Sequence, residues 1–120
     1  MKTNKKVLFV DTVHPLIKEA FEDKGFRCDF FPDYTYEDFL KIIPAYEGVI
    51  IRSKIPMDRD ILMKAKDLRF IGRVGAGMEN IDLEFARSKG IACFNSPEGS
   101  RDAVGEHAIG LLLGLLRKIA

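Results

Sequence analysis

The sequence has almost no net charge and only two cysteines. A formal net charge of +1 over 120 residues gives no electrostatic reason to expect nucleic acid or a membrane surface as a partner. Cys28 and Cys93 lie in apolar, strand-like runs without CxxC spacing, which predicts reduced, buried thiols. The sequence also offers no cluster of residues with metal-ligand spacing, so we expect no metal site.

Long apolar runs are equally scarce at the start of the chain. A basic segment ending at Lys6 is followed by only four apolar residues before Asp11, which is too short for a signal peptide. We therefore expect a cytoplasmic protein. The longest apolar segment, residues 103–120, borders on the length of a membrane span, but its three glycines and its charges at both ends favour a buried helix of a soluble protein.

Five short apolar runs alternate with four helical patterns. The runs that predict strands cover residues 6–10, 26–31, 48–51, 68–71 or a little beyond, and 91–94. Helices are predicted to begin near Pro15, Thr35, Asp58 and Asp82. Nearly continuous apolar strands joined by helices are typical of a parallel sheet covered on both faces. The expected fold is α/β: a flavodoxin-like, doubly wound, mostly parallel five-stranded sheet.

A glycine turn, Gly75-Ala76-Gly77, follows the fourth predicted strand. The dinucleotide-binding pattern Gly-x-Gly-x-x-Gly belongs after a first strand and needs a third glycine, but Asn80 stands at that position here. The dinucleotide interpretation is therefore rejected. Two alternatives stay open: a tight turn whose backbone N–H groups bind a carboxylate or phosphate, and a plain turn into a helix.

A second candidate, Arg52-Ser53, follows the third predicted strand. Ligands of open α/β sheets bind outside the carboxyl ends of the strands, where both this pair and the glycine turn are expected. An arginine fork matches a carboxylate in a bidentate manner, and a serine hydroxyl adds a hydrogen bond. The alternative is a solvated arginine that begins a loop.

Asp11 ends the first predicted strand, which suggests a phosphorylation receiver. A receiver also needs an aspartate after the third strand and a lysine after the fifth. Those positions hold Arg52-Ser53 and Asn95-Ser96, so this hypothesis is rejected.

The two histidines give no catalytic pair. His14 precedes Pro15 at the entry to a helix. His107 follows Glu106, but adjacent residues on a helix point about 100° apart and do not face one substrate together. Both histidines are interpreted as structural, and the residues alone predict an anion site without catalytic machinery.

Three segments together resemble the D-isomer-specific 2-hydroxyacid dehydrogenases. They are Val-Gly-Ala-Gly-Met-Glu-Asn-Ile-Asp at 74–82, Ile-Arg-Ser at 51–53, and Asn-Ser-Pro-Glu-Gly-x5-Gly-Glu-His at 95–107. The resemblance covers essentially the whole chain. It implies a substrate-binding domain over residues 1–98 and, over residues 99–120, an apolar linker helix that begins an NAD-binding domain. The cofactor motif and the catalytic Arg, Glu and His of the family are expected beyond Ala120, so no catalytic residue is placed in this chain.

The resemblance also implies roles for particular residues. The implied contacts to the substrate carboxylate are Arg52, Ser53, Gly75, Ala76 and Gly77. Ala76 and Val104 are implied to border the cofactor, NAD.

The implied function is that of an NAD-dependent oxidoreductase acting on a small anionic D-2-hydroxyacid. The expected substrate is 3-phospho-D-glycerate, oxidised to 3-phosphohydroxypyruvate in serine biosynthesis. The 120 residues alone are expected to be inactive and to form a homodimer through the apolar C-terminal helix. The alternative is a stand-alone, non-catalytic α/β module that binds an anion or regulates another protein.

Overall fold

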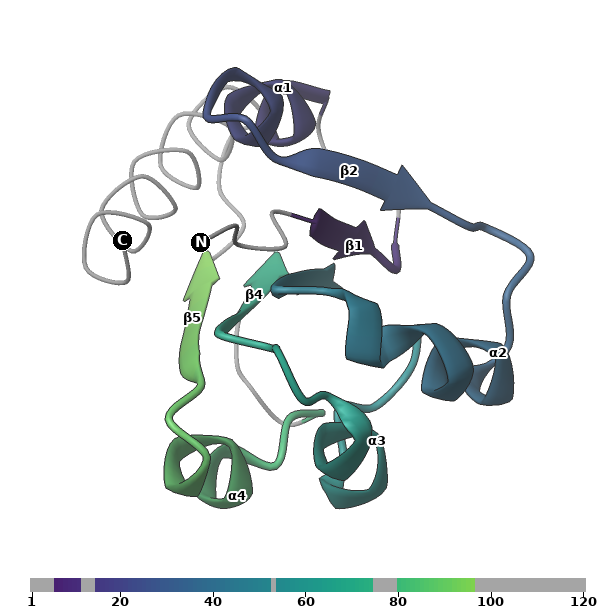
Figure 1. Cartoon of the computed structure of the whole chain (residues 1–120), viewed down its shortest axis with the longest axis vertical. Coiled ribbons are helices and arrows are strands. Elements are labelled where there is room, and N and C mark those ends of the chain that lie inside the picture. Colours follow the sequence, from purple (N-terminus) through teal and green to yellow (C-terminus); the bar gives the residue numbers. More distant parts are fainter. Residues whose placement is uncertain (1–5, 12–14, 53, 75–79, 97–120) are drawn as a thin grey trace.

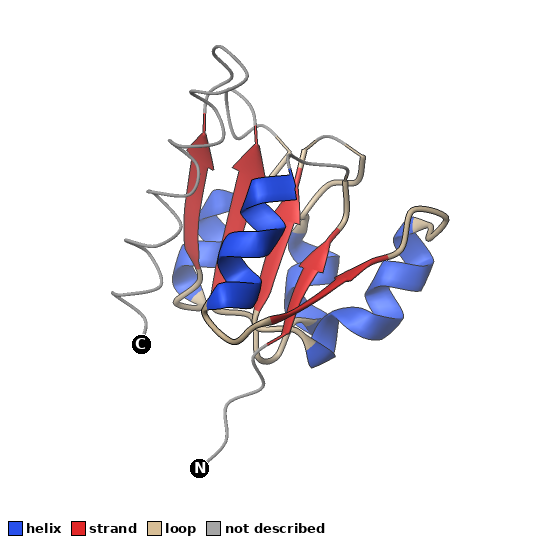
Figure 2. Cartoon of the chain, turned by 90° about the horizontal axis from the view of Figure 1, so that it is seen from above, coloured by secondary structure: helices blue, strands red, loops and turns tan. Residues whose placement is uncertain are grey.

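Five parallel strands form one sheet with helices on both faces (Figures 1 and 2). A computed structural model describes residues 6–11, 15–52, 54–74 and 80–96. Its elements are β1 (Lys6–Phe9), α1 (Pro15–Asp23), β2 (Arg27–Phe30), α2 (Tyr36–Ile42), the 3₁₀ turn η1 (Ile43–Ala45), β3 (Gly48–Ile51), α3 (Arg59–Lys64), β4 (Phe70–Val74), α4 (Leu83–Ser88) and β5 (Ala92–Ser96). The strand order is β2-β1-β3-β4-β5, which confirms the predicted flavodoxin-like arrangement. The predicted helix over 99–120 and the domain boundary at 98 lie outside the described residues.

The strand order explains which helix covers which face. The chain moves outward from β1 to β2, then returns past β1 to β3 and continues to β5. Because crossovers between parallel strands are right-handed, this reversal places α1 on one face and α2, α3 and α4 on the other, as Figure 1 shows. Alternate residues of β1 accordingly enter two cores. Val7 and Phe9 pack with Ile17 and Phe21 of α1, whereas Leu8 packs in the core beneath the other three helices. No helix within the described ranges is long and apolar enough to cross a membrane.

Side-chain caps fix where α2, α3 and α4 begin, the three helices that share one face of the sheet. The Thr35 hydroxyl accepts a hydrogen bond from the Asp38 N–H, and the Asp38 carboxylate accepts one from the Thr35 N–H, which forms a capping box. Hydrogen bonds to the carboxylate from the Thr35 backbone N–H and from the Thr35 hydroxyl hold the pKa of Asp38 below its usual value. Asp58 and Asp82 cap α3 and α4 through the N–H groups of Ile61 and Phe85. All three starts agree with the sequence-based predictions.

The last two strands begin and end later than their apolar runs. For β4 the prediction allowed an end a little beyond Ile71, and the strand ends at Val74, whereas β5 extends past its predicted end at Phe94. β4 begins at Phe70 instead of Leu68, and β5 begins at Ala92 instead of Ile91. Leu68 and Ile91 are buried, but they belong to the turns that precede the strands. Polar residues continue the ladder instead, with Arg73 paired to Asn95. The apolar runs therefore mark burial, while the hydrogen-bonded pairing of the strands continues through polar residues.

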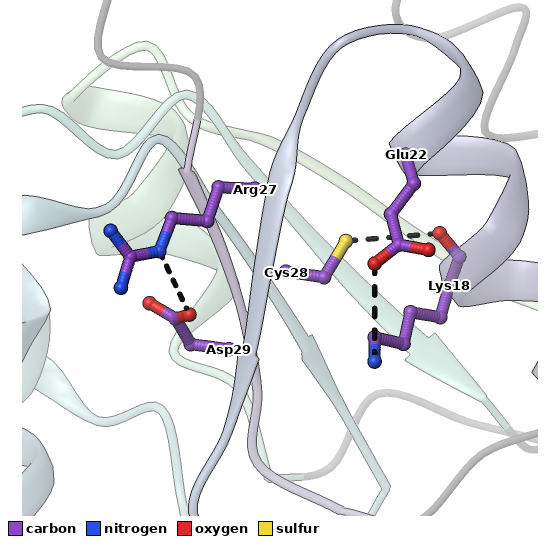
Figure 3. Close-up of polar contacts among 5 residues, drawn as sticks. All are labelled: Lys18, Glu22, Arg27, Cys28 and Asp29. Atoms are coloured by element: carbon purple, nitrogen blue, oxygen red, sulfur yellow. Dashed lines mark hydrogen bonds and ion pairs between the residues drawn. The ribbon is translucent and has the colours of Figure 1, made fainter.

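The prediction that both cysteines are buried was wrong. Cys28 and Cys93 are free thiols of intermediate exposure. Cys28 lies on the edge strand β2, and Figure 3 shows its thiol directed toward Lys18 and Glu22 of α1, on the side opposite Arg27 and Asp29. Its Sγ lies 3.8 Å from the Lys18 carbonyl oxygen. Partial burial, followed by the negative charge of Glu22, raises the pKa of Cys28 to about 11.

We expect Cys28 to be a slow nucleophile at neutral pH, because the thiolate is the reactive form. Raising the pKa from 9.0 to about 11 lowers the thiolate fraction at pH 8 by about a hundredfold. The measurement is the rate of iodoacetamide alkylation in a Cys93→Ser background, which should keep rising with pH up to about 11. Glu22→Gln should accelerate the reaction, since it removes a charge that raises this pKa. A rate at pH 8 equal to that of cysteine in a short peptide would contradict the prediction.

Candidate anion site at the carboxyl edge of the sheet

The strand register brings the ends of β1, β3 and β4 together. Phe9 pairs with Ile50, and Ile51 pairs with Arg73. Continuing the first register by two residues places Asp11, which follows β1, beside Arg52, which follows β3. Both residues are partly exposed. The carboxyl edge of an open α/β sheet is where ligands bind, so Arg52 lies where the sequence predicted it.

Asp11 holds the chain on both sides of position 53. Its Oδ2 atom accepts hydrogen bonds from the N–H of Arg52 at 2.5 Å and from the N–H of Lys54 at 3.4 Å. Sequence reasoning considered Asp11 only as the aspartate that ends the first strand of a phosphorylation receiver, and it missed this role. The available signal was the flavodoxin-like strand order, because that order makes β1 and β3 neighbours and brings their ends together.

Asn80 holds the same loop from the opposite side. Its side-chain amide nitrogen donates to the carbonyl oxygens of Arg52 at 3.1 Å and of Ile55 at 3.3 Å. Its Oδ1 atom accepts from Nε of Arg73 on β4 at 2.8 Å. The Asn80 carbonyl also accepts from the N–H of Met57 at 2.7 Å. The residue that occupies the third-glycine position of the dinucleotide pattern is therefore a side-chain hub, and a glycine there would provide none of these side-chain hydrogen bonds.

Lys54 ties the loop to a third segment. Its Nζ donates to the carbonyl oxygen of Pro32 at 2.6 Å and lies 5.9 Å from the ring centroid of Phe39. Pro32 lies between β2 and α2. Hydrogen bonds of Arg52 and Lys54 thus connect the described residues that follow β1, β2, β3 and β4.

Of the predicted site residues, Arg52 is described and the others are not. Ser53, Gly75, Ala76, Gly77 and Val104 lie outside the described residues, as do His14 and His107. Within the described ranges, no group of three His, Cys, Asp or Glu side chains is placed to hold a metal ion. The described geometry places a partly exposed arginine, with its backbone N–H and carbonyl hydrogen-bonded, at the carboxyl ends of the strands. A guanidinium is the side-chain group suited to binding a carboxylate or phosphate.

Several curated proteins with similar sequences are named D-3-phosphoglycerate dehydrogenase. The chain is 32% identical over 114 residues to D-3-phosphoglycerate dehydrogenase of Archaeoglobus fulgidus, an alignment that covers 95% of this chain and 22% of that protein. It is 37% identical over 117 residues to D-3-phosphoglycerate dehydrogenase of Synechocystis, covering 98% of this chain and 21% of that protein. The chain thus spans about a fifth of the length of these relatives.

Solved structures show the same fold. NAD+-bound 3-phosphoglycerate dehydrogenase of Entamoeba histolytica superimposes with a TM-score of 0.71 at 29% identity, covering 90% of this chain and 38% of that chain. The apo-structure of D-lactate dehydrogenase from Escherichia coli gives a TM-score of 0.66 at 28% identity, covering 95% and 38%. The family model for the D-isomer specific 2-hydroxyacid dehydrogenase catalytic domain matches residues 7–110. This match confirms the resemblance found in the sequence, and the chain belongs to the D-isomer specific 2-hydroxyacid dehydrogenase family.

Proposed function

We propose that this chain is the substrate-binding portion of an NAD-dependent dehydrogenase that oxidises 3-phospho-D-glycerate to 3-phosphohydroxypyruvate in serine biosynthesis. Membership of the family supports the reaction class, and the shared name of the curated relatives supports the substrate. The observation that carries the proposal is the position of Arg52 at the carboxyl edge of the sheet, with its backbone N–H and carbonyl both held by side chains.

In this proposal, Arg52 neutralises and orients the substrate carboxylate. A guanidinium forms two parallel hydrogen bonds to a carboxylate, which fixes both the position and the rotation of the bound group. Fixing the carboxylate also fixes the adjacent C2 atom, from which the hydride leaves. Ser53, Gly75, Ala76 and Gly77 are proposed to complete the cradle around the same carboxylate.

NAD is the proposed cofactor of the complete enzyme, where it accepts the C2 hydride. One of the structural relatives is NAD+-bound. The two residues proposed to border the cofactor, Ala76 and Val104, lie outside the described residues. The described part of the chain therefore contributes substrate binding and orientation, and the 120 residues alone are proposed to bind substrate without oxidising it.

Titration of the ¹⁵N-labelled chain with 3-phospho-D-glycerate, followed by NMR, tests the proposal. We expect Arg52→Met to weaken binding at least tenfold, since a hydrogen bond to a charged group contributes about 1.5–3 kcal/mol. Arg69→Met is the matched control. It makes the same change of charge next to the amino end of β4, where the arginine pairs with Glu47 at 3.5 Å, and it should bind as the wild type does.

Two further ligands define the substrate class. D-Lactate keeps the 2-hydroxyacid group without the phosphate, and inorganic phosphate is an anion without the 2-hydroxyacid. We expect 3-phospho-D-glycerate to bind most tightly and inorganic phosphate to bind weakly. Equal binding of all three by a site insensitive to Arg52→Met would overturn the proposed function.

A further inference from the structure

We propose that Asp11 and Asn80 are positioning residues for Arg52: they hold its two peptide groups from opposite sides and so present its guanidinium to the anion. This inference rests on the proposed function, in which Arg52 binds the substrate carboxylate. It adds two residues that do not contact the substrate themselves.

The two side chains reach Arg52 from separate parts of the chain. Asp11 follows β1 and accepts from the Arg52 N–H at 2.5 Å. Asn80 lies between β4 and α4 and donates to the Arg52 carbonyl at 3.1 Å. With both peptide groups fixed, the direction in which the Arg52 side chain leaves the backbone is also fixed. Binding an anion then requires less ordering of the loop, which is the usual benefit of preorganisation.

Each of the two side chains also forms a hydrogen bond to a described residue beyond Arg52. Asp11 also accepts from the Lys54 N–H at 3.4 Å, and Asn80 also donates to the Ile55 carbonyl at 3.3 Å. The Asn80 amide is itself oriented, because its oxygen accepts from Nε of Arg73 at 2.8 Å. A side chain that only filled space would not need an oriented amide between two carbonyls and a guanidinium.

The charge of Asp11 gives the inference a distinctive sign. A carboxylate beside an anion site repels the anion, so its charge alone weakens binding. If Asp11 acted only through its charge, removing it would strengthen binding. If it acts by holding the Arg52 N–H, truncation to alanine weakens binding although a negative charge has been lost. The conservative variant Asp11→Asn keeps an oxygen that accepts the N–H and loses the charge.

The experiment measures the dissociation constant of 3-phospho-D-glycerate by NMR for four variants of the 120-residue chain. We expect Asp11→Ala and Asn80→Ala to weaken binding about tenfold. Asp11→Asn should bind as tightly as the wild type or more tightly. The stability control is Tyr46→Phe, which removes a 2.6 Å hydrogen bond from the Tyr46 hydroxyl to Asp29. Tyr46 lies just before the amino end of β3, away from Arg52, so this variant should leave the dissociation constant unchanged. Hydrogen exchange of the Arg52 amide should be at least tenfold faster in Asp11→Ala than in the wild type.

The outcomes separate this inference from the proposed function. Loss of binding in Arg52→Met together with wild-type binding in Asp11→Ala and Asn80→Ala overturns the inference and leaves the proposed function intact. Tighter binding in Asp11→Ala also overturns it, because Asp11 would then act through charge alone. Wild-type binding in Arg52→Met overturns the proposed function and this inference with it. If Asp11→Ala does not fold, Asn80→Ala decides: weaker binding of 3-phospho-D-glycerate in this variant supports the inference, and wild-type binding overturns it.

Discussion

Gly48→Ala should lower the free energy of unfolding by about 3 kcal/mol, a large share of the roughly 5–15 kcal/mol that stabilises a domain of this size. Gly48 begins β3 and lies directly opposite Phe70 on β4. A Cβ atom at position 48 would overlap the ring of Phe70, which is fully buried. The Phe70 ring has little room to move away, because other rings pack against it. Its centroid lies 5.7 Å from that of the stacked Phe21 ring and 6.3 Å from that of Phe26, which it meets edge-on. Urea denaturation followed by circular dichroism measures the effect.

The control for Gly48→Ala is the same substitution in a Phe70→Leu background. Leucine removes the ring that the new methyl group meets, so Gly48→Ala should cost less than about 1 kcal/mol there, and the double-mutant cycle should show a coupling of about 2 kcal/mol. Additive costs would show that the clash with Phe70 is not the cause. In that case the loss at position 48 would have another origin, such as the pairing of β1 with β3.

The limits of β3 could be predicted from the sequence, but the requirement for glycine at its first position could not. The apolar run 48–51 agrees with β3 because every residue in it is buried. The overlap with Phe70 depends on the register between β3 and β4, and no short-range pattern specifies that register. The shifted limits of β4 and β5 have a related cause: hydrogen-bond pairing continues through Arg73 and Asn95, while a prediction from apolar runs stops at the first polar residue.

The candidate site was predicted in the same uneven way. The position of Arg52 could be predicted, because a polar residue that follows a buried strand of an α/β sheet lies at the carboxyl ends of the strands, where ligands bind. Asp11 and Asn80 were both noticed in the sequence. Asp11 was considered as the first-strand aspartate of a receiver, a hypothesis that was rejected, and Asn80 as the residue in place of a third glycine. Their contacts to Arg52 span 41 and 28 residues and depend on the strand order and on the turn after β4. Motif comparison assigns residues one segment at a time and does not predict such contacts.

Asp58→Ala is expected to lower the free energy of unfolding by about 2 kcal/mol, because it removes a helix cap and leaves a tyrosine hydroxyl without its partner. The Asp58 carboxylate accepts from the N–H of Ile61 at 3.1 Å, which caps α3, and from the hydroxyl of Tyr36 on α2 at 2.6 Å. The Asp58 carboxylate thus joins α2 and α3, which lie on the same face of the sheet. Thermal or urea denaturation of Asp58→Ala, Asp58→Asn and Tyr36→Phe measures the separate contributions.

The variants of Asp58 and Tyr36 distinguish the cap from the link between helices. Asp58→Asn keeps an oxygen for the cap and should lose less than half of what Asp58→Ala loses, while Tyr36→Phe should lose about 1 kcal/mol. A readout at alkaline pH is independent of the cap. Burial, followed by the hydrogen bond to Asp58, raises the pKa of Tyr36 from 10.0 to about 12. Between these values the unfolded chain has lost a proton that the folded chain keeps, so stability falls as pH rises from 10 to 12. Tyr36→Phe should make that fall shallower, and an unchanged pH dependence would show that the hydroxyl is not held by Asp58 in solution.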